Sequence, residues 1–264
     1  IFTSHSPYVL EEFTLEETVV LARDAQGALR RSAITLPDSV KLKRYRQEFR
    51  TRFCEGLLTR RILVAEGATE AASFPVVCRR LAELKPATYS SLEALGICTI
   101  DAGGETNISD LAKLYRDLGK RTLAICDKQT DEEKALIEAQ VDTLFMHDEK
   151  GFEDLVLKNT TEDALKRFTK LIVWPQHLQQ KYPDPEAQAQ AALSDYFCGK
   201  KADWGVSDFL AQCTEDEIPE WLRDTCLSLK AICEPVHVGD ADGGALNAPE
   251  APDSEQGVDV DATN

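Results

Sequence analysis

The sequence lacks any apolar stretch long enough to cross a membrane. A transmembrane helix needs about 20 consecutive apolar residues, and no uninterrupted apolar run in the 264 residues approaches that length. A charged leader followed by a short apolar core and a cleavage site is also missing, so the sequence gives no support for secretion. We therefore expect a soluble cytoplasmic protein with no membrane partner.

The eight cysteines include no Cys-x-x-Cys pair, the spacing typical of zinc sites. They stand at positions 54, 78, 98, 126, 198, 213, 226 and 233, and most fall inside apolar runs. Buried free thiols in a reducing compartment are favoured over disulfides or a zinc site.

Basic residues are outnumbered, 30 against 46 acidic ones, and the net charge of −16 excludes simple adhesion to DNA or to anionic membranes. Half of this charge lies in residues 234–264, which contain eight acidic and no basic side chains and are rich in Gly, Ala and Pro. We expect this tail to be disordered.

One short segment is strongly basic. Between positions 41 and 61, eight basic residues stand against Glu48 and Glu55, and apolar residues from Leu42 to Leu57 recur at helical spacing. Such a face is either merely solvated or contacts phosphates. The candidate DNA-binding residues are Lys41, Lys43, Arg44, Arg46 and Arg50.

After a hairpin expected across residues 18–36, short apolar runs alternate with helical patterns from position 62 onward. The expected strands are 62–65, 97–100, 123–126 and 143–146, and the expected helices follow each of them. This alternation predicts an α/β fold with a parallel sheet flanked by helices. From about position 159 to 233 the sequence predicts an additional, mainly helical region.

Each of the four expected strands leads into an acid: Glu66, Asp101, Asp127 and Asp148. The carboxyl ends of parallel strands open on one edge, so these acids should converge there. Gly67 permits a tight turn, and Glu70 in the next helical turn can point over the same edge. Clustered carboxylates repel one another unless hard divalent cations compensate them, although a single acid after a strand is also an ordinary helix cap.

At these residues the sequence resembles a known family. The segment Ile62-Leu63-Val64-Ala65-Glu66-Gly67-Ala68-Thr69-Glu70 is similar to the glutamate motif of Toprim domains, which are metal-binding α/β modules of topoisomerases, primases and some nucleases. Leu123-Ala124-Ile125-Cys126-Asp127 is similar to the strand with their aspartate motif. The opening residues 1–10, IFTSHSPYVL, resemble the switch-histidine segment that closes an ABC-type ATPase domain. Together these features resemble the C-terminal region of overcoming-lysogenization-defect (OLD) family nucleases.

The resemblance implies a domain organisation. Residues 1–60 would hold the end of the ATPase domain, a hairpin and a basic linker helix, and residues 61–158 the Toprim catalytic domain. Residues 159–233 would form the helical region with a late active-site lysine, and residues 234–264 the acidic tail. Because the chain starts at Ile1 without Met and has no Gly-x-x-x-x-Gly-Lys-Ser/Thr loop, we expect a fragment without ATPase activity.

The sequence departs from the Toprim pattern at one position. The aspartate motif normally has a second Asp two residues after the first, and here Gln129 stands there. Its carbonyl can ligate a metal but brings no charge, so Asp101 and Glu153 are candidates to complete a second ion site. The family's late lysine corresponds to Lys201 or Lys200, either of which could instead be plain surface charge.

These features predict a divalent-metal-dependent endodeoxyribonuclease. The resemblance implies catalytic roles for Glu66, Glu70, Asp127 and Lys201, with Glu66, Glu70, Asp101, Asp127 and Glu153 holding two Mg²⁺ or Mn²⁺ ions and Ca²⁺ as a non-productive substitute. Expected partners are DNA, the N-terminal ATPase domain of the full-length chain and a second copy in a homodimer. The alternatives are a non-catalytic Toprim scaffold for regulation or subunit pairing, or a topoisomerase- or primase-like enzyme.

Overall fold

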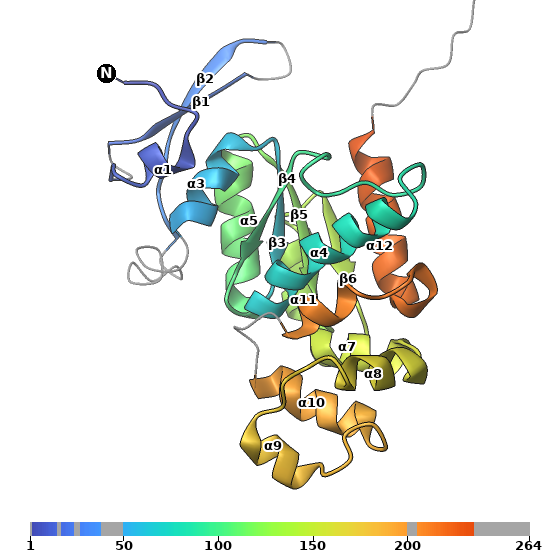
Figure 1. Cartoon of the computed structure of the whole chain (residues 1–264). Coiled ribbons are helices and arrows are strands. Elements are labelled where there is room, and N and C mark those ends of the chain that lie inside the picture. The colour runs from blue at the N-terminus through green and yellow to red at the C-terminus, as the bar shows by residue number, and fades with distance from the viewer. Residues whose placement is uncertain (1, 15–16, 24–26, 38–49, 200–204, 235–264) are drawn as a thin grey trace, which may run out of the picture. The chain divides into compact units, whose positions relative to one another are not determined.

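We analysed a computed structural model, which describes residues 2–14, 17–23, 27–37, 50–199 and 205–234. Its central element is a four-stranded parallel sheet in the order β4-β3-β5-β6 (Figure 1). The strands are β3 (Arg61–Ala65), β4 (Ile97–Asp101), β5 (Arg121–Cys126) and β6 (Thr143–Met146). The predicted α/β fold and all four predicted strands are confirmed.

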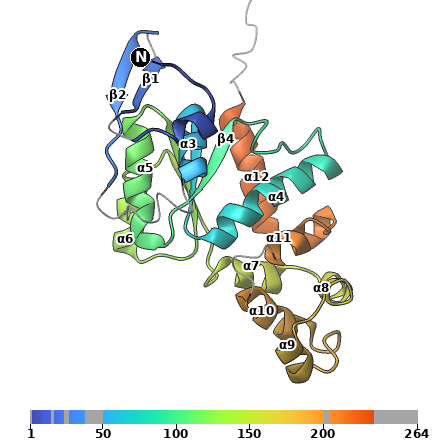
Figure 2. The same cartoon turned by 60° about the vertical axis from the view of Figure 1, so that its left-hand side comes forward.

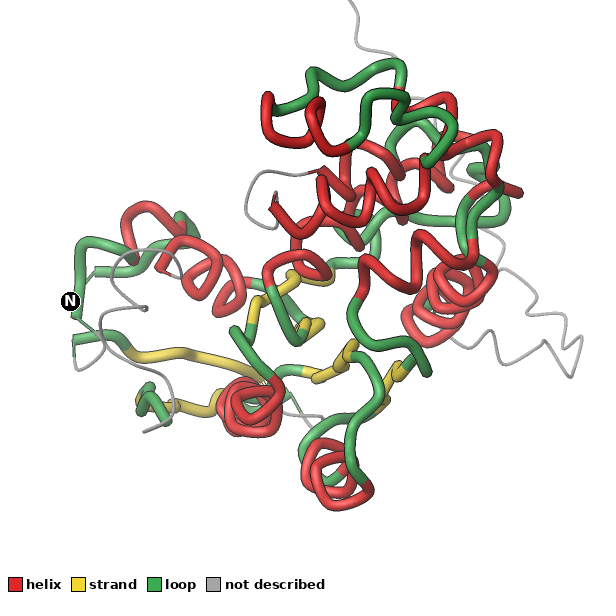
Figure 3. Tube along the Cα trace, turned by 90° about the horizontal axis from the view of Figure 1, so that it is seen from below, coloured by secondary structure: helices red, strands yellow, loops and turns green. Residues whose placement is uncertain are grey.

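Helices cover both faces of this sheet (Figures 2 and 3). One face packs against α3 (Arg50–Leu58), α5 (Ile108–Asp117) and α6 (Asp131–Glu138). The hydrophobic core on the other face contains residues of α4 (Ala68–Leu84), α7 (Phe152–Asn159), α8 (Glu162–Thr169), α10 (Ala189–Gly199), α11 (Gly205–Leu210) and α12 (Glu220–Cys233). Within the described residues, every helix is too short or too polar to cross a lipid bilayer.

Alternation along the strands decides which side chains enter which core. Leu63 and Ala65 of β3 belong to the core under α4, whereas Ile62 and Val64 belong to the core under α5. Successive side chains of a strand point to opposite faces, and both faces are covered, so all four residues are fully buried. The continuous apolar run in the sequence follows from this double burial.

The remaining elements lie before and after the sheet. The N-terminal region contains α1 (Pro7–Leu10) and an antiparallel hairpin of β1 (Val19–Arg23) and β2 (Leu29–Ala33), which confirms the predicted hairpin. The helical region also contains α9 (Gln176–Lys181), and two short 3₁₀ helices span Glu105–Asn107 and Glu215–Glu217. The expected acidic tail lies outside the described residues except for Glu234, and so do residues 41–49 of the basic segment.

The helical region shares its core with the sheet. Phe168, Phe197 and Phe209 pack edge-on or tilted against one another and belong to the same hydrophobic cluster as Leu63 of β3. Apolar contact of this kind joins α8, α10 and α11 to one another within the hydrophobic cluster that also includes residues of the sheet.

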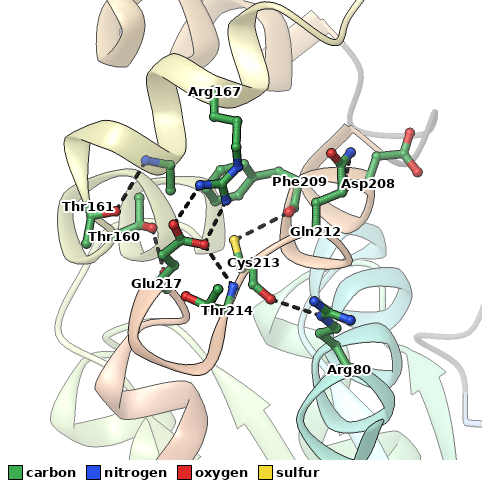
Figure 4. A network of polar contacts seen from close by, with 11 residues as sticks. Arg80, Thr160, Thr161, Arg167, Asp208, Phe209, Gln212, Cys213, Thr214 and Glu217 are labelled. Atoms are coloured by element: carbon green, nitrogen blue, oxygen red, sulfur yellow. Dashed lines mark hydrogen bonds and ion pairs between the residues drawn. The ribbon is translucent and has the colours of Figure 1, made fainter. Parts of the chain in front are cut away.

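A polar network reinforces this packing (Figure 4). Arg167 of α8 donates two parallel hydrogen bonds to the Glu217 carboxylate, at 2.8 and 2.7 Å. Arg80 of α4 donates from Nε to the carbonyl oxygen of Cys213, at 2.9 Å. The loop between α11 and α12 is therefore bound both to α8 and to α4.

All eight cysteines are free thiols, as the sequence predicts, and six of them are buried. Cys78 of α4 and Cys226 of α12 lie with their Sγ atoms 3.0 Å apart. At the amino end of the sheet, Arg61 donates to the carbonyl oxygen of Cys233 and Arg121 to that of Ile232. Cationic side chains at a helix C-terminus interact favourably with its free carbonyls, so they stabilise the end of α12.

Candidate active site

The acids that follow the inner strands meet at the carboxyl edge of the sheet. Ala65 of β3 pairs with Asp101 of β4 on one side and with Ile125 of β5 on the other. Glu66 follows Ala65 directly, and Asp127 stands two residues beyond Ile125. The backbone N–H of Glu66 donates to the carbonyl oxygen of Ile125, at 3.1 Å, so the chain crosses this edge with a fixed register.

Glu66 and Asp127 form a closely connected pair. Glu66 Oε2 accepts hydrogen bonds from the backbone N–H of Asp127, at 3.2 Å, and from Nε2 of Gln129, at 3.0 Å. The same Nε2 lies 3.0 Å from Asp127 Oδ1. Asp127 Oδ2 accepts from the backbone N–H of Gly151, also at 3.0 Å. Three strand-following segments therefore converge on two carboxylates.

Glu70 stands in the first turn of α4 and turns back over the helix start. A methyl group on Gly67 would lie 3.1 Å from Glu70 Oε2, so the absence of a side chain at position 67 leaves the carboxylate its place. Only 7% of Glu70 is exposed. Its negative charge interacts with those of Glu153, Asp127 and Asp101, which places all four acids in one electrostatic neighbourhood.

Glu153 approaches from α7. Thr69 Oγ1 donates to Glu153 Oε1 at 2.9 Å, and both residues are buried. Gly151 precedes α7 with a φ of 92°, a conformation that favours glycine. This turn aims one backbone N–H at Asp127 and presents Glu153 to the helix that carries Glu70.

Burial and mutual repulsion make the ionised cluster costly. Burial, followed by the charge of Asp127, raises the pKa of Glu66 from 4.5 to about 7. The pKa of Glu70 also rises to about 7, because burial and the charges of Glu153, Asp127 and Asp101 outweigh the hydrogen bond from its own backbone N–H. Groups with this balance take up protons or bind cations near neutral pH.

The donor set suits a hard divalent cation, which prefers carboxylate and carbonyl oxygens. Gln129 Oε1 is buried and has no hydrogen-bond partner among the described residues. No three His, Cys, Asp or Glu side chains within the described ranges converge as a ready ligand set. Beside the carboxylates of Glu66 and Asp127, the third polar side-chain group is the amide of Gln129, which is hydrogen-bonded to both.

The structure thus places Glu66, Glu70, Asp101, Asp127 and Glu153 in one electrostatic neighbourhood, without arranging three of them as a preformed ligand set among the described residues. Asp148 is exposed, and its charge acts on the buried His147. Of the four strand-following acids, Glu66, Asp101 and Asp127 interact electrostatically with Glu70. His147 is 2% exposed and lies edge-on to Trp221 of α12, with ring centroids 5.2 Å apart, and burial lowers its pKa.

Most of the predicted basic site residues lie outside the described part of the chain. Lys200 and Lys201 lie outside the described residues, as do Lys41, Lys43, Arg44 and Arg46. Arg50 is the first residue of α3 and donates from Nη2 to the carbonyl oxygen of Phe13, at 3.3 Å. These residues keep their roles only as proposals.

Sequence reasoning missed two residues that hold acids of the site. They are Thr69 and Gly151, which donate hydrogen bonds to Glu153 and Asp127. Only Gly151 had a signal, since a glycine before an expected helix indicates an unusual backbone conformation.

The comparison with family models identifies the central part of the chain. Residues 57–128 match the model described as overcoming lysogenization defect protein-like, TOPRIM domain. These residues form an OLD-like Toprim domain. The matched range contains Glu66, Glu70, Asp101 and Asp127, four of the five acids in the cluster.

Solved structures similar to this chain include two from OLD proteins. The C-terminal region of the Burkholderia pseudomallei OLD protein is 15% identical, and the alignment covers 67% of this chain and 99% of that one, with a TM-score of 0.45. The C-terminal region of the Xanthomonas campestris pv. campestris OLD protein is 17% identical, with 67% and 96% covered and a TM-score of 0.44. The comparison with curated proteins finds no match to this chain.

Proposed function

We propose that this chain is the nuclease region of an OLD-type protein and cleaves DNA in a reaction that depends on divalent metal ions. The observation that carries the proposal is the convergence of Glu66, Glu70 and Asp127 at one sheet edge, two of them with a pKa of about 7. A fold without cations there would bear a stability cost for no structural gain. The match of residues 57–128 to a Toprim domain supports the same function.

Glu66 and Asp127 would hold one cation, and Glu70 would hold a second with Asp101 or Glu153. Bound Mg²⁺ or Mn²⁺ supplies Lewis acidity toward the phosphate and lowers the pKa of a coordinated water, while Ca²⁺ would bind without supporting the reaction. The protein fixes these carboxylates through Gly151 N–H on Asp127 and Thr69 Oγ1 on Glu153. Such preorganisation orients the ligands before substrate binds.

Lys201, with Lys200 as the alternative, would offset negative charge that develops on the phosphate. Ser207 Oγ of α11 lies 3.0 Å from Ser73 Oγ on α4, one helical turn from Glu70, so the described residues that follow position 204 pack beside the helix that carries Glu70. Lys41, Lys43, Arg44, Arg46 and Arg50 would contact DNA phosphates.

Plasmid nicking tests the proposal. The wild-type protein should nick supercoiled DNA in Mg²⁺ or Mn²⁺, and Glu70→Ala and Glu70→Gln should each lower the rate by at least about 100-fold while folding normally. Asp148→Asn is the matched control, because Asp148 follows the fourth strand but is exposed. An undiminished rate in both Glu70 variants would refute the assignment.

A non-catalytic scaffold is the second candidate, and Gln129 favours it because a neutral amide stands where the aspartate motif has a carboxylate. Metal titration separates the two functions. A scaffold should show no Mn²⁺-dependent nicking and little thermal stabilisation by the ion, whereas an ion at 100 times its Kd stabilises a protein by about 2.7 kcal/mol.

The protein context is part of the proposal. An ABC-type ATPase domain that precedes Ile1 in the full-length chain, and a second copy in a homodimer, are the proposed protein partners. A covalent adduct between this chain and DNA would instead favour a topoisomerase-like reaction.

A further inference from the structure

Gln129 holds the two central carboxylates of the cluster together. It follows β5, it is 8% exposed, and its Nε2 makes every hydrogen bond of the side chain. This nitrogen lies 3.0 Å from Glu66 Oε2, 3.0 Å from Asp127 Oδ1 and 3.2 Å from the Asp127 carbonyl oxygen. The amide thus supplies donors to two anionic groups that would otherwise face each other.

The position of Nε2 also suits a metal ligand. In an octahedral site with metal–oxygen distances of about 2.1 Å, neighbouring ligand atoms lie about 3.0 Å apart. The distances from Nε2 to Glu66 Oε2 and to Asp127 Oδ1 are both 3.0 Å. An oxygen at this position would therefore stand at the right separation from both carboxylate oxygens to share one ion with them.

The other end of the amide leaves it free to turn. Oε1 is buried and has no hydrogen-bond partner among the described residues. Rotation of the terminal amide by about 180° exchanges Oε1 and Nε2 and breaks no hydrogen bond at Oε1. The bonds that rotation does break, those from Nε2 to the carboxylates, are the ones that a bound cation replaces.

We propose that Gln129 is a two-state positioning residue: its Nε2 holds Glu66 and Asp127 together without metal, and its Oε1 turns inward to become a neutral third ligand when Mg²⁺ or Mn²⁺ binds. This inference rests on the proposed metal-dependent function and assigns the site its one uncharged ligand. It also accounts for the tolerance of an amide at a position where the family has an acid.

Binding of Mn²⁺ alone, measured by calorimetry and by electron paramagnetic resonance, tests the inference without any cleavage assay. Gln129→Ala should weaken Mn²⁺ binding by about 10- to 100-fold, the range for lost groups that support a metal site. Gln129→Glu should bind Mn²⁺ more tightly than wild type because it supplies a charged oxygen. Without metal at pH 8, the same Gln129→Glu protein should melt at a lower temperature, because it adds a third carboxylate and removes the donor.

Mn²⁺ binding and the melting temperature without metal distinguish a Gln129 that ligates the ion from one that only blocks the site. If the amide only blocks the site, Gln129→Ala will bind Mn²⁺ as tightly as wild type or more tightly, and the inference is overturned. A wild-type protein that binds no Mn²⁺ overturns both this inference and the proposed function. Unchanged binding in the variants together with Glu70-dependent nicking overturns the inference alone.

A crystal of the wild-type protein soaked in Mn²⁺ provides a test that does not depend on the folding of a variant. The anomalous peak of the ion should lie about 2.2 Å from the terminal side-chain atom of Gln129, a distance typical of a metal–oxygen bond. A peak between Glu66 and Asp127 that stands more than about 3 Å from Gln129 would overturn the inference.

Discussion

Replacing Glu70 with glutamine should stabilise the metal-free protein at pH 8, although it removes a proposed catalytic group. The pKa of Glu70 is about 7 in the folded protein, against an ordinary value of 4.5. Each pKa unit corresponds to about 1.4 kcal/mol, so ionised Glu70 destabilises the fold by roughly 3 kcal/mol. Solvent screening reduces this little, because the side chain is 7% exposed.

The direction of the pH dependence follows from linkage. The folded state holds its proton more tightly than the unfolded state does, so the stability that protonated Glu70 provides is complete below about pH 4.5. This stability is lost as the pH rises from about 4.5 through 7. Above about pH 7, ionised Glu70 destabilises the fold by the full amount. Since Glu66 has a pKa shifted in the same direction, its ionisation adds to the slope.

Thermal melting in EDTA between pH 5 and pH 8 measures the effect. At pH 8, Glu70→Gln should melt about 6 to 12 °C above wild type, at roughly 2 to 4 °C per kcal/mol for a chain of this size. The gap should close toward pH 5, and Mn²⁺ should raise the melting temperature of wild type more than that of the variant. Glu138→Gln, at an exposed position on α6, should follow the wild-type curve. Parallel curves for wild type and Glu70→Gln would refute the reasoning.

Two further predictions concern the parts that hold the site. Arg167→Ala should lower the free energy of unfolding by about 1 to 2 kcal/mol at pH 7, because the two hydrogen bonds from Arg167 lower the pKa of Glu217 to about 2. Chemical denaturation should show that the difference between wild type and variant vanishes as the pH falls through about 2. A difference that stays constant with pH would contradict this prediction. In a thiol-reagent time course, Cys198 should react first and half-buried Cys233 second, with the other six cysteines unreactive until unfolding; native-state modification of Cys78, whose pKa burial raises well above its usual value, would contradict the packing.

The sheet and its acidic edge were predictable because both depend on local patterns. Runs such as Ile62 to Ala65 are apolar without interruption since helices cover both faces of the sheet. Parallel pairing then forces Glu66, Asp101 and Asp127 to one edge, whatever the intervening sequence is.

Asp148 shows what this reasoning leaves open. It follows β6, which pairs with β5 and is the edge strand of the sheet that the described residues form. Side chains alternate as the chain leaves the strand: His147 turns inward and is buried, so Asp148 turns outward and is exposed. The position of an acid after a strand therefore fixes the edge it reaches but leaves open which way its side chain points.

The sequence pattern gave almost no indication of the groups that orient the acids. Several of them are backbone atoms, and others lie far from the acids in the sequence. Gly151 N–H reaches Asp127 across 24 residues, and Thr69 reaches Glu153 across 84. Any residue other than proline offers a backbone N–H, so its use cannot be read from residue type. The pairing of Cys78 with Cys226 spans 148 residues and depends on the packing of α12 on α4.

This long-range packing connects the helical region to the chemistry of the site. Glu70 keeps its place only while the first turns of α4 are fixed, and Ser207 of α11 contacts α4 at Ser73, one turn beyond Glu70. Arg80, farther along the same helix, binds the loop that follows α11. Both contacts come from residues after position 200, so α4 is held on its outer side by chain that follows the Toprim match. A truncation at residue 158 would therefore remove the support of Glu70 while leaving every acid of the cluster in the sequence.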